Sequence, residues 1–258
     1  MKIKLALCAI TGFIIILSAC NNTPKINDQT AYSSSEIKTF LYPSFNYEID
    51  TKVFKHTDTK RQVGISINYP QINGISDIAI QTQTNEQIEN TALKPYYEIF
   101  GDEENIDDGT EWSVEHSIVY ISNSIISIKF EGSIFTEGNA HGINMIYAIN
   151  INLKTGKEIT LDELFDESFK GKLDNSVFIG VDVDTSDADN AAMEEIFNRF
   201  KNNFMDNYNN FYFGLDEFVI ILPISNYFRF STTYENLKDC MKLDNPLWSE
   251  VLKLNISE

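Results

Sequence analysis

The sequence is poor in cysteine, in histidine and in positive charge. Its 258 residues include three cysteines, three histidines and 20 lysines and arginines, against 38 aspartates and glutamates. A zinc site would have to combine scattered residues, and contacts to phosphates need an excess of positive charge. We therefore expect no metal site, and the net charge of −18 excludes nucleic acid as a partner.

The motifs of common catalytic sites are also missing. The chain has no Gly-x-Ser-x-Gly turn, no glycine-rich phosphate loop ending in Lys-Ser/Thr, no His-Glu-x-x-His and no Cys-x-x-Cys. We therefore expect no catalytic residue and no cofactor, and a binding role is favoured over an enzymatic one.

The first twenty residues are typical of an export signal. Two lysines precede an apolar run over residues 5–17, which is short for a membrane span, and small residues lead into Cys20. This pattern resembles a bacterial lipoprotein signal, which implies removal of residues 1–19, lipidation of Cys20 and anchoring in a membrane of the cell envelope. Asn21 favours the outer membrane where a cell has two. The alternative is an ordinary secretory peptide that ends at a cysteine.

Removal of this signal changes both the cysteine content and the charge. Cys240 becomes the only unmodified cysteine, so no internal disulfide is expected and the thiol is predicted to be buried. The loss of Lys2 and Lys4 takes the net charge to −20. A strongly acidic exported surface attracts basic partners, and plain solubility is the alternative explanation.

The remaining chain divides into a tether and one domain. Residues 20–41 are polar and without periodicity, which indicates a flexible tether. Residues 42–258 contain short alternating stretches joined by turns, which predicts one α+β domain divisible into subdomains 42–100 and 110–245. We expect an antiparallel sheet of hairpins packed against one long and one or two shorter helices.

Prolines and capping residues set the expected limits of the elements. A hairpin turns about residues 57–60 and ends at Pro70, and a helix capped by Asp77 runs to about Leu93, with Pro95 beyond its end. Farther along we expect strands on both sides of Ser122-Asn123-Ser124 and a capping box of Thr160 and Glu163. The longest helix is expected at about residues 187–208. A closing hairpin ended by Pro223 and a last helical turn opened by Pro246 follow it.

A hairpin within residues 131–165 organises the centre of the chain. Apolar residues fall two apart from Ile143 to Leu153, which predicts a half-buried antiparallel strand. The loop before this strand has two glycines that permit a tight turn. The candidate binding residues lie here: Glu137, Gly138, Asn139, His141 and Gly142. The alternative is that His141 bonds a backbone carbonyl and only fixes the corner between the strands.

Two acidic stretches are weaker candidates. Residues 182–186 have the one, three, five spacing of a calcium loop, but Asp187 stands where glycine is needed and Met193 where a bidentate glutamate is needed. An acidic helix start explains this stretch better. Residues 102–111 form either a solvated connection or a docking patch for a basic protein.

The central residues resemble the extracytoplasmic domain shared by the anti-sigma factor RsiV and the peptidoglycan deacetylase PdaC. Members show a Gly-Gly-Ala-His-Gly loop, a strand leading to Thr-Gly-Lys and a Leu-x-Asp-Leu-Phe helix. This chain matches that pattern at Gly138, Ala140, His141, Gly142, Thr155, Gly156, Lys157, Leu161, Leu164 and Phe165. Asn139 departs from the second loop glycine, and the likeness spans residues 45–243.

The resemblance implies a binding module at the cell envelope. The anti-sigma relative senses lysozyme, and the deacetylase relative carries its chemistry in a separate domain. We therefore expect a membrane-anchored, non-enzymatic lipoprotein that binds a lysozyme-like basic protein or peptidoglycan. The alternatives are a peptidoglycan- or carbohydrate-modifying enzyme, in which His141 acts with Glu137 or Glu131, and a passive structural lipoprotein.

Overall fold

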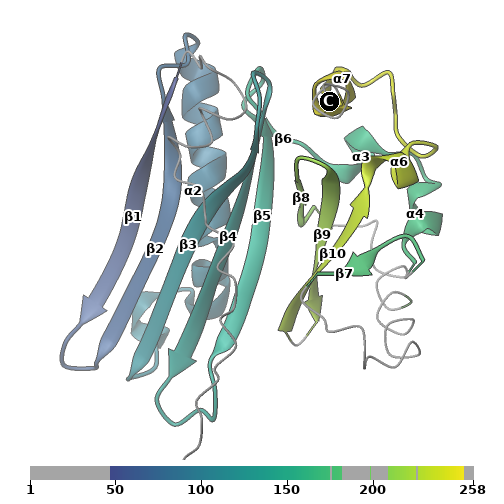
Figure 1. Ribbon diagram of the computed structural model, residues 1–258. Helices are drawn as coiled ribbons and strands as arrows, with labels where there is room; N and C mark the ends of the chain where they lie inside the picture. The colour runs from purple at the N-terminus through teal and green to yellow at the C-terminus, as the bar shows by residue number, and fades with distance from the viewer. Residues whose placement is uncertain (1–46, 175, 182–197, 199–208, 225, 253–258) are drawn as a thin grey trace, which may run out of the picture. The chain divides into compact units, whose positions relative to one another are not determined.

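Alternating apolar residues build two β-sheets in this chain. The computed structural model describes residues 47–174, 176–181, 198, 209–224 and 226–252. Six strands pair in the order β1-β2-β3-β4-β5-β6, and four pair in the order β7-β10-β9-β8 (Figure 1). The predicted α+β class, with mostly antiparallel strands and one long helix, is confirmed.

The first sheet holds the long strands of the chain. These are β1 (Glu48–Asp58), β2 (Val63–Asn73), β3 (Thr110–Ile121), β4 (Ile125–Thr136), β5 (Ile143–Asn152) and the short β6 (Lys157–Glu158). All neighbours are antiparallel except β2 and β3, which pair in parallel. A parallel pair needs a crossover, which helix α2 (Ile78–Phe100) and the short 3-10 helix η1 (Glu103–Asn105) supply.

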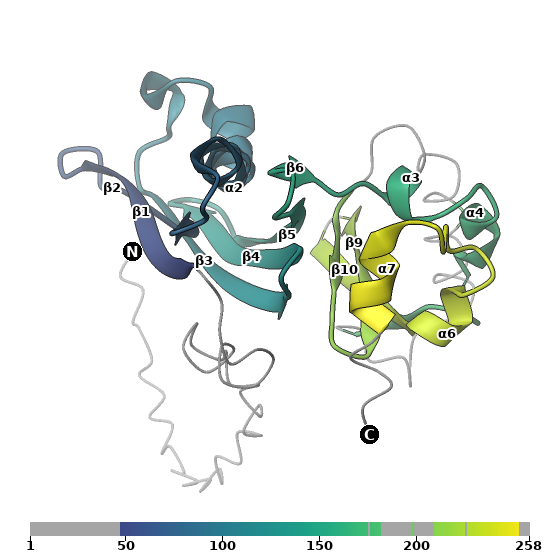
Figure 2. The ribbon, with the colours of Figure 1, turned by 90° about the horizontal axis from the view of Figure 1, so that it is seen from above.

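Helix α2 covers one face of the first sheet, as Figure 2 shows from above. Because side chains alternate along strands, this face collects the apolar residues of every long strand. The resulting core is mainly aliphatic and includes Val63, Ile65, Ile67, Ile72, Ile88, Leu93, Val114, Ile126, Ile128, Ile149 and Ile151.

The start of α2 agrees with the sequence prediction. The Asp77 carboxylate accepts hydrogen bonds from the backbone N–H groups of Ala79 at 2.9 Å and Ile80 at 3.3 Å. Ile88 is buried, whereas Ile78 is 67% exposed because it lies in the first turn, outside that core.

The predicted end of α2 near Leu93 is wrong, because the helix runs through Pro95 to Phe100. A proline inside a helix removes a backbone donor and strains the preceding turn. Burial of Tyr96 and Phe100 after the proline offsets that loss. Gly101 then ends the helix with a φ of 66°, which glycine adopts without strain.

Two other prolines also lie inside strands that they were predicted to end. Strand β2 continues past Pro70, where its pairing with β3 has already stopped at Ile67. A proline beyond that point removes no hydrogen bond to β3. Pro223 lies one residue before the end of β9 (Glu217–Ile224).

The second sheet contains short strands surrounded by short helices. Its other strands are β7 (Ile179–Gly180), β8 (Phe211–Phe213) and β10 (Asn226–Thr233). The helices are α3 (Leu161–Leu164), α4 (Phe169–Lys172), α6 (Tyr234–Leu237) and α7 (Pro246–Val251). Their shared core is aromatic and includes Phe165, Phe169, Phe178, Phe211, Phe213, Phe218, Phe230, Tyr234 and Trp248.

The capping signals of the short helices are confirmed. The Glu163 carboxylate accepts a hydrogen bond from the backbone N–H of Thr160 at 3.3 Å, as a capping box requires. Pro246 opens α7, and Asn245 caps it. Cys240 is buried as predicted, and burial raises the pKa of its thiol to about 11.

Buried polar side chains connect the two sheets. The Asn150 side chain donates to the Phe211 carbonyl at 2.7 Å and accepts from the Ser127 hydroxyl. That hydroxyl also accepts from the Phe213 N–H at 3.2 Å. Strand β8 is therefore fixed to strands β4 and β5 through groups that water does not reach.

Several predicted segments lie outside the described residues. They are the signal over residues 1–19, the tether over residues 20–41, the calcium-like residues 182–186 and nearly all of the longest predicted helix. The domain limits and the lipidation of Cys20 also stay predictions. Among the helices of the described residues, none combines the length and the hydropathy that a membrane crossing requires.

Candidate binding site at the loop end of the first sheet

Three connections lie at one end of the first sheet. They are the β1–β2 turn (residues 59–62), the loop that holds η1 (residues 101–109) and the β4–β5 loop (residues 137–142). The strand register brings them together, because Gly64 pairs with Glu111 and Thr110 pairs with Thr136. Figure 1 shows the β1–β2 and β4–β5 turns at the lower end of these strands. We call the three connections the loop end.

Hydrogen bonds join the three connections into one unit. The Gly109 N–H donates to the Arg61 carbonyl at 2.8 Å, and the Glu137 N–H donates to the Gly109 carbonyl at 3.1 Å. The Arg61 guanidinium donates to Asp108 Oδ1 at 2.7 Å and to the Ile106 carbonyl. Arg61 therefore fixes the acidic loop against the β1–β2 turn.

A glycine permits the close approach of two of these loops. Gly109 has a φ of 70°, and a Cβ added there would lie 2.6 Å from the Cβ of Glu137. No larger residue fits without a backbone shift, and a side chain would also be strained at this φ. The acidic loop and the predicted binding loop are thus in direct contact.

The five predicted binding residues all lie in the β4–β5 loop and are exposed: Glu137, Gly138, Asn139, His141 and Gly142. Gly138 has a φ of 93°, which explains the glycine at this turn. The His141 Nδ1 atom lies 3.1 Å from the Gly142 carbonyl. This contact is of the kind that fixes a corner, and a binding role for His141 stays a prediction.

Glu131 lies too far from His141 for the two to act on one atom. Glu131 is on β4, six residues before Glu137, and this length of strand spans about 20 Å. Its carboxylate instead contacts Lys129 Nζ at 2.8 Å and Arg229 Nη1 at 3.4 Å. No group of three or more metal-ligating side chains occurs in the part of the chain that the structure describes.

The loop end carries a large excess of negative charge. Residues 101–109 contribute five carboxylates and Glu137 a sixth, whereas Lys60 and Arg61 are the lysine and arginine of the three connections. The Arg61 and Lys60 backbone N–H groups also hold the pKa of Asp58 below its usual range. Carboxylates therefore outnumber lysine and arginine on this surface.

Two exposed apolar side chains beside the β4–β5 loop escaped the sequence analysis. Phe135 is 40% exposed and Ile143 is 53% exposed. The alternating pattern places Ile143 on the buried face with Met145, but Ile143 belongs to the last pair of the β4–β5 ladder, next to the loop. The alternation of residues along a strand predicts on which face of the sheet a side chain lies. It does not predict how far along the strand the core covers that face.

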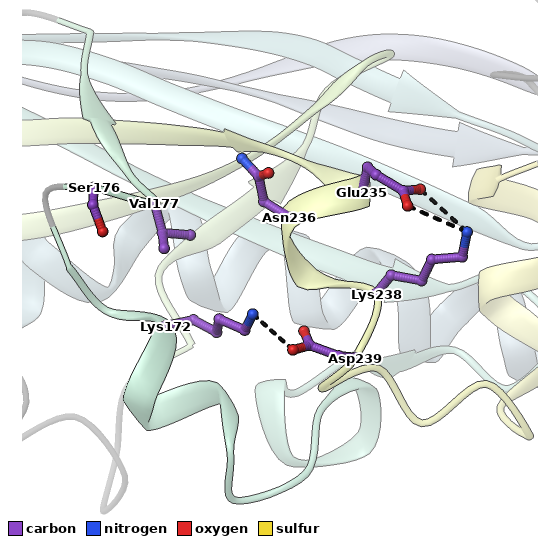
Figure 3. Close-up of a pocket in the computed structure, with 7 residues that line it drawn as sticks. All are labelled: Lys172, Ser176, Val177, Glu235, Asn236, Lys238 and Asp239. Atoms are coloured by element: carbon purple, nitrogen blue, oxygen red, sulfur yellow. Dashed lines mark hydrogen bonds and ion pairs between the residues drawn. The ribbon is translucent and has the colours of Figure 1, made fainter.

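A separate hollow lies in the second region of the chain, between α4 and α6 (Figure 3). Its volume is about 460 Å³, and it is lined by Lys172, Ser176, Val177, Glu235, Asn236, Lys238 and Asp239. Lys172 Nζ lies 2.8 Å from Asp239, and Lys238 Nζ lies 3.2 Å from Glu235. Its cations are thus paired, and none of the predicted site residues lines it.

Comparison with known families identifies the first sheet. Residues 55–144 match the family model described as "Deacetylase PdaC". This part of the chain is similar to a PdaC-type domain. The resemblance seen in the sequence is thereby confirmed, and the matched residues include all three connections of the loop end.

The chain is also similar to solved structures. A member of the DUF3298 family from Bacteroides fragilis superimposes with a TM-score of 0.55 and 16% identity, over 80% of this chain and 97% of that chain. A DUF3298 protein from Pseudomonas aeruginosa gives a TM-score of 0.47 and 11% identity, over 76% and 94%. No curated protein matches the sequence. The first likeness shows the shared fold.

Proposed function

We propose that this protein is a non-enzymatic binding module, anchored at the cell envelope through Cys20, whose loop end binds a basic wall-active protein such as lysozyme. The observation that carries the proposal is the joining of three connections into one hydrogen-bonded acidic surface. The predicted lipoprotein signal supports the location, and the net charge of −18 supports a basic partner.

The contacts of the loop end favour a preformed binding surface. Arg61 and Gly109 hold the loops together, so less chain entropy is lost when a partner docks. The carboxylates speed the approach of a cationic protein, and their effect weakens with added salt. Phe135 and Ile143 supply apolar area at the edge of the charged surface.

Titration of the full chain, purified in mild detergent, with hen lysozyme tests the proposal. We expect binding that is tighter at about 0.02 M salt than at about 0.15 M salt. The double variant Asp107→Asn with Glu137→Gln should weaken it. The matched variant Glu167→Gln with Asp244→Asn removes the same charge from exposed sites outside the loop end and should bind nearly as well as the parent.

Two results would overturn the proposal. One is the absence of binding at both salt concentrations. The other is an equal loss of affinity in the two double variants, because binding would then follow net charge and not the loop end.

A peptidoglycan-modifying enzyme is the second candidate, because the matched family model is described as a deacetylase. Glu137 is the acidic residue that shares the loop with His141, whereas Glu131 lies along the strand. Release of acetate from peptidoglycan that is abolished in His141→Ala would favour this candidate. Unchanged peptidoglycan fragments would count against it.

A further inference from the structure

The hollow between α4 and α6 is built on the aromatic core of the second sheet (Figure 3). Phe169 of α4 and Leu237 of α6 are buried in that core, and Val177 in the lining of the hollow packs against it. The volume of about 460 Å³ lies within the range of about 300–1,000 Å³ that is typical of small-molecule sites. The helices that carry the lining side chains are therefore held in place by buried neighbours.

Charged side chains of both signs line the hollow: Lys172, Lys238, Glu235 and Asp239. Lys172 Nζ lies 2.8 Å from Asp239 Oδ2, a contact that joins α4 to the residues after α6. Lys238 pairs within its own turn, with Nζ 3.4 Å and 3.2 Å from the two oxygens of Glu235. Figure 3 shows both pairs at the hollow. The charges of these lining residues therefore sum to zero.

The pair of Lys172 and Asp239 is open to exchange with a ligand. The Asp239 side chain is 70% exposed, whereas that of Lys172 is 27% exposed, so the lysine is the more enclosed member. An exposed ion pair contributes little to stability, and a ligand can therefore replace one member at small cost. Asn236 lies three residues before Asp239, and its side-chain carbonyl oxygen can accept a hydrogen bond.

We propose that this hollow binds an apolar amino acid in its zwitterionic form, with the carboxylate on Lys172, the ammonium group on Asp239 and the side chain against Val177. A lone anion on Lys172 would lie beside the like charge of Asp239, and a lone cation on Asp239 would lie beside that of Lys172. A zwitterion between the two gives each of them an opposite charge. This inference does not depend on the proposed function, because the hollow and the loop end share no residue.

Two asparagine side chains provide a direct test. Free leucine, titrated into the isotopically labelled full chain in mild detergent, should shift the side-chain amide resonance of Asn236. That of Asn245 should not move, because this amide donates to the Glu163 carbonyl at 2.9 Å and does not line the hollow. N-acetyl-leucine lacks the ammonium group, and leucine amide lacks the carboxylate. Each should bind at least about five times more weakly than leucine.

Single variants locate the effect. Lys172→Met and Asp239→Asn should each weaken leucine binding about three- to tenfold, because each removes one of the two opposite charges. Lys170→Met and Asp244→Asn are matched controls, because both side chains are exposed and neither lines the hollow. Both should bind leucine like the parent, and circular dichroism should show that all four variants fold.

Three results would overturn this inference. The first is an Asn236 resonance that about 10 mM leucine leaves in place. The second is an equal response to leucine and to either of its singly charged analogues, because the hollow would then select one ion and not a zwitterion. The third is leucine binding that is unchanged in both Lys172→Met and Asp239→Asn. Lysozyme binding at the loop end can succeed or fail without altering any of these results.

Discussion

The two sheets of this protein are stabilised by different kinds of core. Aliphatic side chains, most of them isoleucine and valine, make up the larger part of the core between α2 and the first sheet. Aromatic rings fill the core of the second sheet, where Phe165 stacks on Phe169 at 4.2 Å and Phe211 stacks on Phe218 at 5.2 Å. Trp248 closes this second core against Phe213 at 6.1 Å.

The difference follows from the length of the elements. Strands of ten or more residues, as in β1 to β5, bury many β-branched side chains in regular rows. Strands and helices of two to eight residues bury few side chains each, so each one must contribute a large apolar area. Long strands also leave exposed turns, and these form the loop end.

The largest expected effect is on the aromatic core. Phe218 is fully buried and contacts the rings of Phe165, Phe169, Phe211 and Phe213. Phe218→Ala should lower the free energy of unfolding by about 3–5 kcal/mol, because the cavity cannot close among rigid rings. Urea unfolding followed by tryptophan fluorescence measures it.

The aliphatic core provides the comparison for Phe218. Ile67→Val removes one methylene group from a fully buried position and should lower the free energy of unfolding by about 1 kcal/mol. A loss below about 1 kcal/mol in Phe218→Ala would show that the second core is loosely packed and would remove the distinction between the two cores.

The next effect is on the junction between the sheets. Asn150→Ala leaves the Phe211 carbonyl and the Ser127 hydroxyl without their partner in a buried site. We expect a loss of about 2 kcal/mol. Asn152→Ala, two residues along the same strand and partly exposed, should lose less than about 1 kcal/mol. Equal losses in chemical unfolding would mean that the junction is not a dry polar contact.

A carboxylate in the last helix offers a pH-dependent test of the same junction. Burial opposes the ionisation of Glu250, but hydrogen bonds from Ser124 at 2.5 Å, Ser122 at 2.7 Å and Lys154 at 3.2 Å outweigh it and lower its pKa. This group therefore stabilises the fold above its unfolded pKa of about 4.3, and the contribution is lost as the pH falls through the lower folded pKa.

Replacement of Glu250 should follow that dependence. Glu250→Gln should lower the free energy of unfolding by about 1–2 kcal/mol at neutral pH, and the difference from the parent should shrink below pH of about 4. Unfolding curves measured across this pH range provide the data, with the exposed Glu235→Gln as control. A difference that does not change with pH would contradict the assigned ionisation.

The smallest expected effect is at the loop end. The exposed His141 contacts a single carbonyl of its own loop, so His141→Ala should change the free energy of unfolding by less than about 0.5 kcal/mol. Thermal unfolding measures this change. A loss above about 1 kcal/mol would show that His141 holds the corner and would weaken its candidacy as a binding residue.

The sequence predicted the hairpins well and the helix limits less well. The alternation of apolar and polar residues located β1 to β5. The helix starts predicted from Asp77, Thr160 and Pro246 were correct. The limits set by Pro70 and Pro95 were wrong, because an unpaired edge or a buried helix face tolerates a missing N–H. These circumstances depend on neighbours that are distant in the chain.

The sequence by itself determined which residues form strands, which loop carries the glycines and His141, and that the surface is acidic. The spacing of apolar residues, the residues that favour turns and the charges can all be read from short stretches of the chain. The tertiary structure decided that Arg61 joins the acidic loop to the β1–β2 turn and that Gly109 joins the acidic loop to the β4–β5 loop. The contact between Arg61 and Asp108 joins residues 47 positions apart. The formation of these contacts depends on strand register and on the crossover of α2, which no local pattern specifies.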